Sequence, residues 1–524
     1  NEFAFASRSS LGVDAAQRLP GDSLKYRRAV RIYNKLVAAR GDYRYAIPDF
    51  VMTRDEQKVA WMNFDRLEVG IEEKAYDVCM TFGPDADAAL AQLLGHELSH
   101  YYEKHNWRRD FARQFKDLAV GAQLGVMTQA DSVFNETQAD YLGGFLAYSA
   151  GFPVFDQGAA LTGALYQAYQ LPDALRIYPV LAERKKLNER SAQLLDKLVN
   201  VYEMANLLTA TGHYQQAALY YQHVLQDYQS PAVYNNAGVM TTLAALSLGG
   251  DTTAYTFVLP IELDITSLSG KGANAVEARH NLLREALHHF DAAIALDPDY
   301  APAYLNKACA LVLLSDKTRA AYYAGVEVPA AVGRQPTYKK TAVDARVVLG
   351  ILQIMQGDSA KADAVFQAVY NQDSSAVARE NLLRLRAKKV TPAAMSQPAL
   401  SLIPETIDGL DLYLSKDELA VDYDGRLQLG AGLTFYQNLR PGPHSKLLVS
   451  EEKSLDGLKK MAFLLTDADY RGETARKIKI GSPAAAVLKA YKSPDEKLET
   501  TRGQLWRYND IIFFLGPDLG DRAG

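Results

Sequence analysis

The first 190 residues place their apolar side chains mainly with the spacing of an α-helix. Residues 22–40 carry them along one side, which predicts an amphipathic helix. In two shorter stretches, 58–63 and 67–71, apolar residues alternate with polar ones or follow one another directly, as in short strands. A longer helical pattern follows, from 86 to about 116. We therefore expect residues 1–192 to form one mostly helical domain that contains a small sheet.

A three-position pattern recurs in residues 193–385. An alanine is followed four residues later by an aromatic residue, and three residues beyond that by a small or apolar one. The three instances are Ala217, Tyr221 and Val224; Ala286, Phe290 and Ala293; and Ala362, Phe366 and Val369. This pattern resembles the tetratricopeptide repeat, which implies an α-solenoid of stacked helix pairs. An irregular helical bundle is the alternative, and residues 249–271 are interpreted as an insertion.

The pattern changes after residue 385. Residues 386–404 carry three prolines and little periodicity, which predicts a linker. Residues 405–524 contain runs typical of strands, a helix ending near Tyr491 and a β-hairpin over 505–515. We expect a small α+β module there, of a role that the sequence does not indicate. The chain as a whole is predicted to be mostly α.

The composition favours a globular protein and argues against several other classes. A chain of 524 residues has room for three or four domains, and 48% apolar with 23% charged residues is typical of globular proteins. The net charge of −5 leaves no cationic excess for nucleic acid. Two cysteines cannot form a disulfide framework or a cysteine-rich zinc site. No apolar run approaches the ~20 residues of a transmembrane helix.

His96, Glu97 and His100 form the motif H-E-x-x-H within the long helical stretch. Residues four apart on a helix differ by only about 40° around its axis, so both histidines project from one face and can bind one Zn²⁺ ion. Glu97 lies beside the metal without binding it, where it can take a proton from water and pass it to a leaving amine. Two solvated histidines on a helix face are the alternative.

A catalytic zinc site usually has three protein ligands and an open position. His105 is a poor third ligand, because nine residues beyond His96 it is expected on the opposite face of the same helix. Glu136 and Asp140 lie four apart on another predicted helix. Glu136 can complete the ligand set, and Asp140 can accept the free N–H of a zinc-bound histidine. Ala139 between them is small enough to let two helices approach closely.

With these motifs, residues from about 50 to 190 resemble the M48 family of gluzincin peptidases, which includes the CAAX prenyl proteases and the HtpX-like proteases. The resemblance rests on the H-E-x-x-H helix and on Glu136-x-x-Ala139-Asp140. The family often carries His-Pro, four further residues and Arg, and its histidine assists the oxyanion. Here Tyr178, Pro179 and Arg184 fit that pattern with tyrosine in place of histidine. A phenol can also donate to an oxyanion, so the resemblance implies catalytic roles for Tyr178 and Arg184.

The resemblance implies a zincin-like fold and a zinc endopeptidase. One Zn²⁺ ion would be held by His96, His100 and Glu136, with Glu97 as the proton carrier. The peptide substrate would lie along an edge strand, as gluzincin substrates commonly do. The two strand-like stretches, 59–63 and 67–71, are both candidates for that edge.

A peptidase domain followed by helical repeats is similar to soluble bacterial proteins that survey outer-membrane assembly. This likeness implies a polypeptide substrate, a protein partner on the repeats, a role in protein quality control and a periplasmic location. The first residue, Asn1, is not methionine, which fits either a removed export signal or a truncation. A cytoplasmic location is the alternative.

Other interpretations stay open. The same residues could belong to a chaperone or protein-binding scaffold that keeps zinc at a latent or inactive protease site. A purely structural zinc is weaker, because such sites are usually closed by four ligands, often cysteines. Residues 118–129, which are apolar and contain two glycines, join the two ligand helices as a helix that roofs the site, as a mobile lid or as a packed connection.

Overall fold

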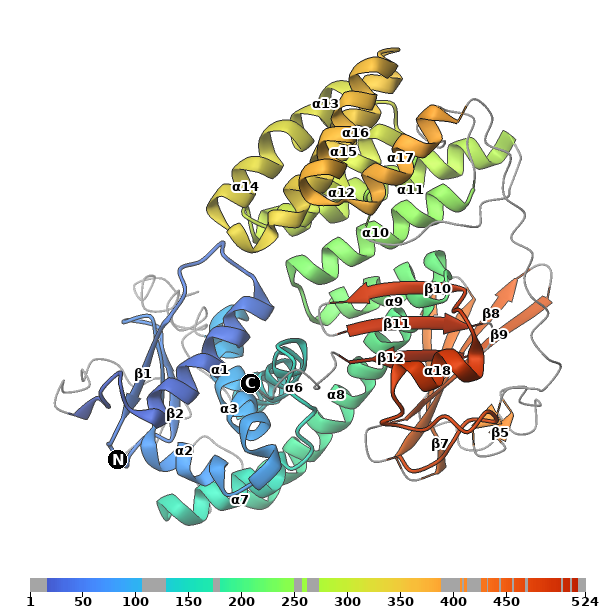
Figure 1. Ribbon diagram of the computed structural model, residues 1–524. Helices are drawn as coiled ribbons and strands as arrows, with labels where there is room; N and C mark the ends of the chain where they lie inside the picture. The colour runs from blue at the N-terminus through green and yellow to red at the C-terminus, as the bar shows by residue number, and fades with distance from the viewer. Residues whose placement is uncertain are drawn as a thin grey trace. The chain divides into compact units, whose positions relative to one another are not determined.

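The computed structural model describes residues 17–105, 129–172, 180–248, 257–261, 273–387, 406–407, 410–411 and, with short gaps, 426–516. These residues are mostly helical with small sheets, as the sequence predicts (Figure 1). They belong to two compact units, Asn1–Val199 with Gln226–Ser230, and Asn200–Leu225 with Pro231–Gly524. The predicted repeats and the predicted C-terminal module therefore both belong almost entirely to the second unit.

The first unit contains a three-stranded sheet. Its strands are β1 (Asp49–Thr53), β2 (Ala60–Asn63) and β3 (Glu68–Glu72). Their order is β1-β3-β2, with β1 parallel and β2 antiparallel to β3. The predicted strands 58–63 and 67–71 are thus confirmed, whereas β1 was missed. Because β3 lies between two partners, only β2 of the two predicted candidates is an edge strand.

Helices make up the rest of the first unit. They are α1 (Leu24–Arg40), α2 (Glu73–Met80), α3 (Ala86–Tyr102), α6 (Gln129–Ser149), α7 (Gly158–Tyr169) and the first part of α8 (Leu181–Ala210). Helix α8 runs across the predicted boundary between residues 192 and 193. The helix predicted from 86 to about 116 ends at Tyr102, because Lys104 adopts a left-handed backbone with φ of 55° that turns the chain away. Residues 118–128, the predicted lid or connection, lie outside the described residues.

The second unit begins with helices. They are the rest of α8, then α9 (Tyr214–Asp227), α10 (Pro231–Ser247), α11 (Ala273–Leu296), α12 (Ala301–Leu313), α13 (Lys317–Tyr322), α14 (Val328–Arg334), α15 (Lys339–Met355), α16 (Ser359–Asp373) and α17 (Ala376–Arg386). A π-helical turn, Tyr323–Glu327, joins α13 to α14. All nine residues of the repeated pattern are buried.

Two glycine–phenylalanine contacts pack helices of the second unit closely. A Cβ atom at Gly238 would meet the ring of Phe290 at 2.6 Å, and one at Gly350 would meet the ring of Phe366 at 2.4 Å. The rings therefore occupy the space that a larger residue would fill. Closely packed pairs of helices agree with the predicted helix pairs, while the tetratricopeptide solenoid itself stays a prediction. Of the predicted insertion, the structure describes residues 257–261, where Val258 exchanges two hydrogen bonds with the side chain of Asn381.

Small sheets complete the second unit. The strands are β4 (Thr406–Ile407), β5 (Leu410–Asp411), β6 (Arg426–Gly430), β7 (Leu433–Gly442), β8 (Ser445–Ser454), β9 (Gly457–Thr466), β10 (Glu496–Thr500), β11 (Gly503–Tyr508) and β12 (Ile511–Leu515). Antiparallel pairing gives β6-β7-β8-β9 and β10-β11-β12, and helix α18 (Ala484–Tyr491) packs against the latter. The predicted helix and the β11–β12 hairpin are confirmed. Of the predicted linker, residues 388–404 lie outside the described residues.

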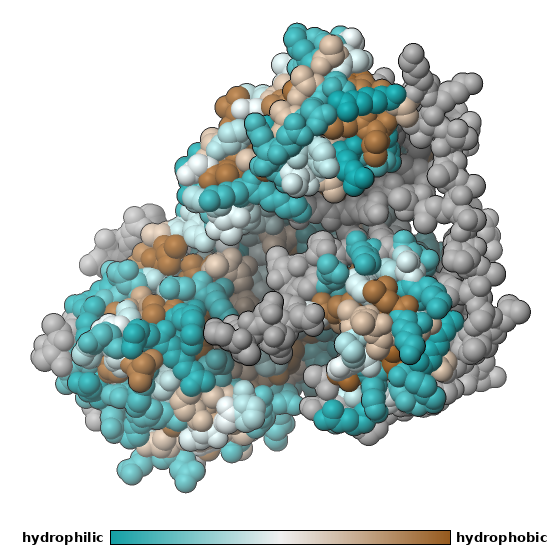
Figure 2. Space-filling model, in the orientation of Figure 1, coloured by the Kyte–Doolittle hydropathy of each residue, from teal (hydrophilic) through white to brown (hydrophobic). Residues whose placement is uncertain are grey.

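Within the described residues, the helices are all too short or too polar to cross a membrane. The face seen in Figure 2 intersperses hydrophobic residues among hydrophilic ones. Singly scattered apolar residues are normal for a protein surface and need no partner to cover them.

Candidate metal centre

Helices α3 and α6 bring the three predicted ligands together. Nε2 of His96 lies 3.1 Å from Nε2 of His100. The Glu136 carboxylate lies 3.5 Å from the first of these nitrogens and 3.6 Å from the second. The ligating atoms of the three residues all lie within 4.8 Å of one another, and all three side chains are buried. The i, i+4 spacing of the histidines thus produces the shared face that the sequence predicts.

Two glycines let the ligand helices approach this closely. A Cβ atom at Gly95 would lie 2.6 Å from the carbonyl oxygen of Gly143, and one at Gly143 would lie 2.5 Å from the backbone nitrogen of His96. The small residue identified from sequence, Ala139, is also fully buried. Backbone therefore touches backbone where α3 crosses α6, one residue before the first ligand. A side chain at either glycine would separate Glu136 from the histidines.

Asp140 orients the first histidine and is itself held from α8. Its Oδ1 lies 2.7 Å from His96 Nδ1, which leaves His96 Nε2 facing Glu136. Nη2 of Arg184 donates to Oδ1 at 3.1 Å, Nη1 lies 2.9 Å from Oδ2, and the Asn188 amide donates to Oδ2 at 2.7 Å. Burial by itself would raise the pKa of Asp140, but the Arg184 charge and the His96 contact outweigh it and hold the pKa low. Asp140 is thus an anion that accepts from three partners.

Glu97 is buried between the histidines and the sheet. Only 2% of its surface is exposed, and the backbone of Met62 in β2 lies close enough to favour its charged form. Its Oε1 has no hydrogen-bond partner among the described residues. Burial, with the charge of Glu136 adding to it, raises the pKa of Glu97 to about 7. A carboxyl group with that pKa can both take up and release a proton near neutral pH.

The two histidines have opposite electrostatic surroundings in the metal-free site. Burial works against protonation of both. Hydrogen bonds to Asp140 and Glu136 nevertheless raise the pKa of His96, whereas burial lowers the pKa of His100, which lacks a hydrogen-bonded carboxylate. The pKa of Glu136 is held low, against the effect of burial, by its contacts with His96, His100 and Arg184. Glu136 is therefore an anion that faces both histidines, and a cation is most strongly attracted to the space between them.

Three other residues were considered from the sequence: Arg184, Tyr178 and His105. Arg184 joins the site, but its guanidinium contacts Asp140 and lies 3.4 Å from the Glu136 carboxylate. Tyr178 lies outside the described residues. The predicted position of His105 is wrong: the turn after α3 folds it back, and its Nδ1 lies 2.8 Å from Nδ1 of His100. It is not part of the cluster of candidate ligands.

Sequence reasoning missed Asn188, Gly95 and Gly143. Asn188 follows Arg184 by four residues on α8, so the pair's helical spacing was an available signal. The glycines gave none, because a glycine within a helical pattern has many explanations. When the chain is compared with models of protein families and with curated proteins, neither comparison finds a match. Function must therefore be inferred from the site's own geometry.

Proposed function

We propose that this chain is a zinc-dependent endopeptidase. The observation that carries the proposal is the buried convergence of His96, His100 and Glu136, whose ligating atoms lie within 4.8 Å of one another. Two imidazole nitrogens and a carboxylate oxygen are a donor set of catalytic zinc sites, which use three protein ligands and keep one position open. The zincin-like character of the first unit is part of this proposal.

The residues present fit the metal on two further counts. Both Nε2 atoms face the Glu136 carboxylate rather than separate hydrogen-bond partners. Glu97 Oε1 is buried without a hydrogen-bond partner among the described residues, next to the ligands, as expected of a group that meets water or substrate there. A bound Zn²⁺ ion supplies Lewis acidity, which polarises a peptide carbonyl and acidifies water.

Glu97 carries the proton in the proposed reaction. Its carboxylate takes a proton from the attacking water and later delivers it to the leaving amine. A buried carboxylate beside the ligands is placed to do both. The backbone of Met62 in β2 lies beside this carboxylate and favours its charged form.

Asp140 and Arg184 keep the ligands in place. Asp140 accepts from His96 Nδ1, so in the neutral ring, which is the form that binds metal, Nε2 carries the lone pair. Arg184 pairs with Asp140 and lies close to Glu136, so we assign it to orienting these two carboxylates. Direct stabilisation of the oxyanion by Tyr178 or Arg184 stays a prediction from the family resemblance.

The substrate we propose is an extended polypeptide. Strand β2 is an edge of the sheet, and the backbone of its Met62 lies beside Glu97. An extended peptide can add to such an edge through main-chain hydrogen bonds, which suits a protease acting on unfolded chains. A protein partner on the helical repeats, a role in quality control and a periplasmic location belong to the same proposal.

The test compares the full chain with its Glu97→Gln variant, both loaded with zinc. An unfolded fluorescent casein serves as substrate, and zinc is quantified in every sample. We expect one zinc per chain in both proteins and a loss of cleavage of about 10²-fold or more in the variant. Glu136→Ala should lose the zinc. Stoichiometric zinc without Glu97-dependent cleavage of any unfolded protein would overturn the peptidase and favour a zinc-containing binding protein.

A further inference from the structure

His105 contacts the second histidine of the site from the side opposite to Glu136. The chain leaves α3 through Lys104, and the His105 backbone N–H donates to the carbonyl of His100 at 3.1 Å. This turn sets Nδ1 of His105 2.8 Å from Nδ1 of His100. Nε2 of His105 lies 3.1 Å from Oε1 of Gln138, two residues after Glu136 on α6.

The chemistry of these three groups fixes where the protons lie. Oε1 of Gln138 is an amide oxygen and can only accept, so His105 carries its hydrogen on Nε2. In neutral His105, Nδ1 is then an acceptor, and His100 must donate from its own Nδ1. That leaves Nε2 of His100 with a free lone pair, directed at His96 and Glu136. Among the arrangements of one hydrogen per ring, this one lets His100 bind a metal through Nε2.

The two histidines of the site are thus held in matching ways. His96 is held through Nδ1 by Asp140, and His100 is held through Nδ1 by His105. We propose that His105, with Gln138 behind it, is a positioning residue that fixes the tautomer and ring orientation of His100. The inference rests on the proposed zinc site. The sequence argued against His105 as a metal ligand, and the inference gives it a different role in the same site.

The test separates the hydrogen bond from simple packing of the ring. His105→Phe keeps an aromatic ring but removes the acceptor, while His105→Asn puts an amide oxygen close to the position of Nδ1. His213→Phe, at an exposed histidine of the second unit, is the control. Zinc affinity of the full chain is measured by competition with a chelator, and the Co²⁺-loaded proteins are compared by visible absorption. Unfolding of each metal-free protein shows that it is folded.

We expect His105→Phe to bind zinc about 10- to 100-fold more weakly and to shift the Co²⁺ spectrum, as loss of such partners does elsewhere. His105→Asn should recover most of the affinity, and His213→Phe should match the wild type. Wild-type affinity and spectrum in His105→Phe, or equal loss in both His105 variants, would overturn the inference. A wild-type chain that binds no zinc would instead overturn the proposed function.

Discussion

Asp140 shows how one buried carboxylate is stabilised at the scale of single residues. It is 8% exposed and receives contacts from His96, Arg184 and Asn188. Removing its charge would leave Arg184 buried with only the more distant Glu136. Loss of one partner from a buried ion pair is costly, because the other partner's desolvation is no longer offset.

Asp140→Asn should therefore lower both stability and metal affinity. We expect a loss of about 3 kcal/mol in the free energy of unfolding of the metal-free chain, and zinc binding weakened by about 10-fold or more. Denaturant unfolding and chelator competition measure the two effects. Asp363→Asn, which breaks the exposed ion pair with Arg386, is the control and should cost below about 1 kcal/mol. Equal small effects in both variants would contradict the role of Asp140.

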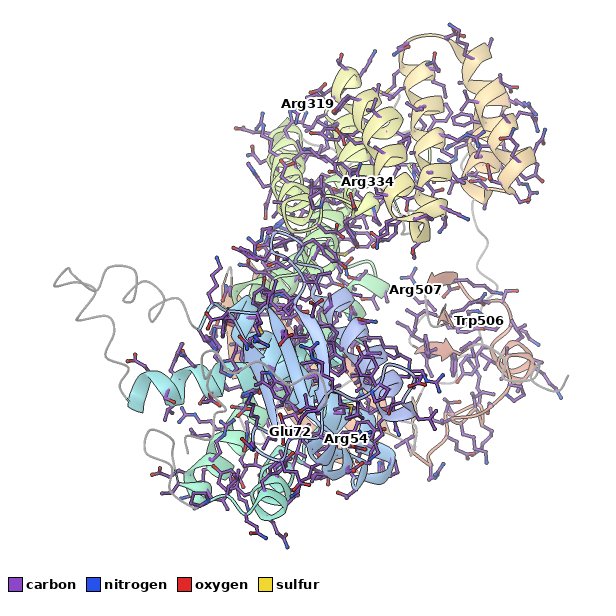
Figure 3. The ribbon with its side chains drawn as sticks, turned by 90° about the vertical axis from the view of Figure 1, so that its left-hand side faces the viewer. Arg54, Glu72, Arg319, Arg334, Trp506 and Arg507 are labelled. Carbon is purple, nitrogen blue, oxygen red and sulfur yellow. The ribbon has the colours of Figure 1, made fainter. Side chains whose placement is uncertain are left out.

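Glu72 gives a pH dependence away from the metal centre. This fully buried residue ends β3, and its carboxylate accepts the backbone N–H groups of Gln57 and Lys58 ahead of β2 (Figure 3 labels Glu72 and nearby Arg54). Burial raises the pKa of Glu72 above its usual 4.5, although these hydrogen bonds oppose the rise. A carboxyl group with a raised pKa in the folded state binds its proton more tightly there, so it favours folding at low pH.

The stability that protonated Glu72 contributes is full below pH 4.5 and is lost as pH rises through the raised pKa. Glu72→Gln mimics the protonated form at every pH. We expect the variant to gain stability relative to the wild type as pH rises above 4.5 towards neutrality. Denaturant unfolding across that range measures the difference. A difference that is constant with pH, or that falls as pH rises, would show that Glu72 is not protonated more readily in the folded chain.

At the scale of elements, the crossing of α3 and α6 sets the geometry of the site. Gly143→Ala should be far more harmful than an ordinary helical glycine replacement, because the new Cβ would lie 2.5 Å from the His96 backbone nitrogen. We expect a loss of roughly 1–3 kcal/mol from overpacking and weaker zinc binding, as Glu136 moves away from the histidines. Unfolding and zinc titrations test both.

Gly333→Ala is the matched control for that replacement. Gly333 lies in α14, and a Cβ atom there would meet nothing within 4 Å. It should be neutral or stabilise the chain by about 0.5–1 kcal/mol, because alanine loses less backbone entropy in a helix. If both replacements behaved alike, the close approach at Gly95 and Gly143 would not position the site.

The sequence predicts elements better than their ends and contacts. Four-residue separations predicted one helix face for His96 and His100 and another for Glu136 and Asp140, and the need of a zinc site for a third ligand suggested that the two faces meet. Helical spacing could not predict His105, whose position depends on the left-handed backbone at Lys104, a residue type that usually continues a helix. Strand β1 was missed because its burial, in which Phe50 to Thr53 are all buried, has no two-residue alternation. The identity of the edge strand depends on long-range pairing.

At the scale of the whole molecule, all three candidate ligands and Glu97 lie in one compact unit. The second unit has a core of its own, in which the ring of Phe290 fills the space at Gly238. Phe290→Ala should therefore destabilise the second unit by roughly 3–5 kcal/mol while zinc affinity is unchanged. Phe514→Ala, at an exposed site, should cost little and serves as control. Loss of zinc binding in Phe290→Ala, under conditions where the chain is folded, would contradict this independence.

We propose that His96, His100 and Glu136 together hold one zinc ion. X-ray absorption at the zinc edge of the full, zinc-loaded chain tests it most directly. We predict two imidazole ligands and oxygen or nitrogen ligands at about 2.0–2.2 Å, with no sulfur, and loss of this spectrum in Glu136→Ala. Sulfur or fewer than two imidazoles around the metal, or an unchanged spectrum in Glu136→Ala, would contradict the account.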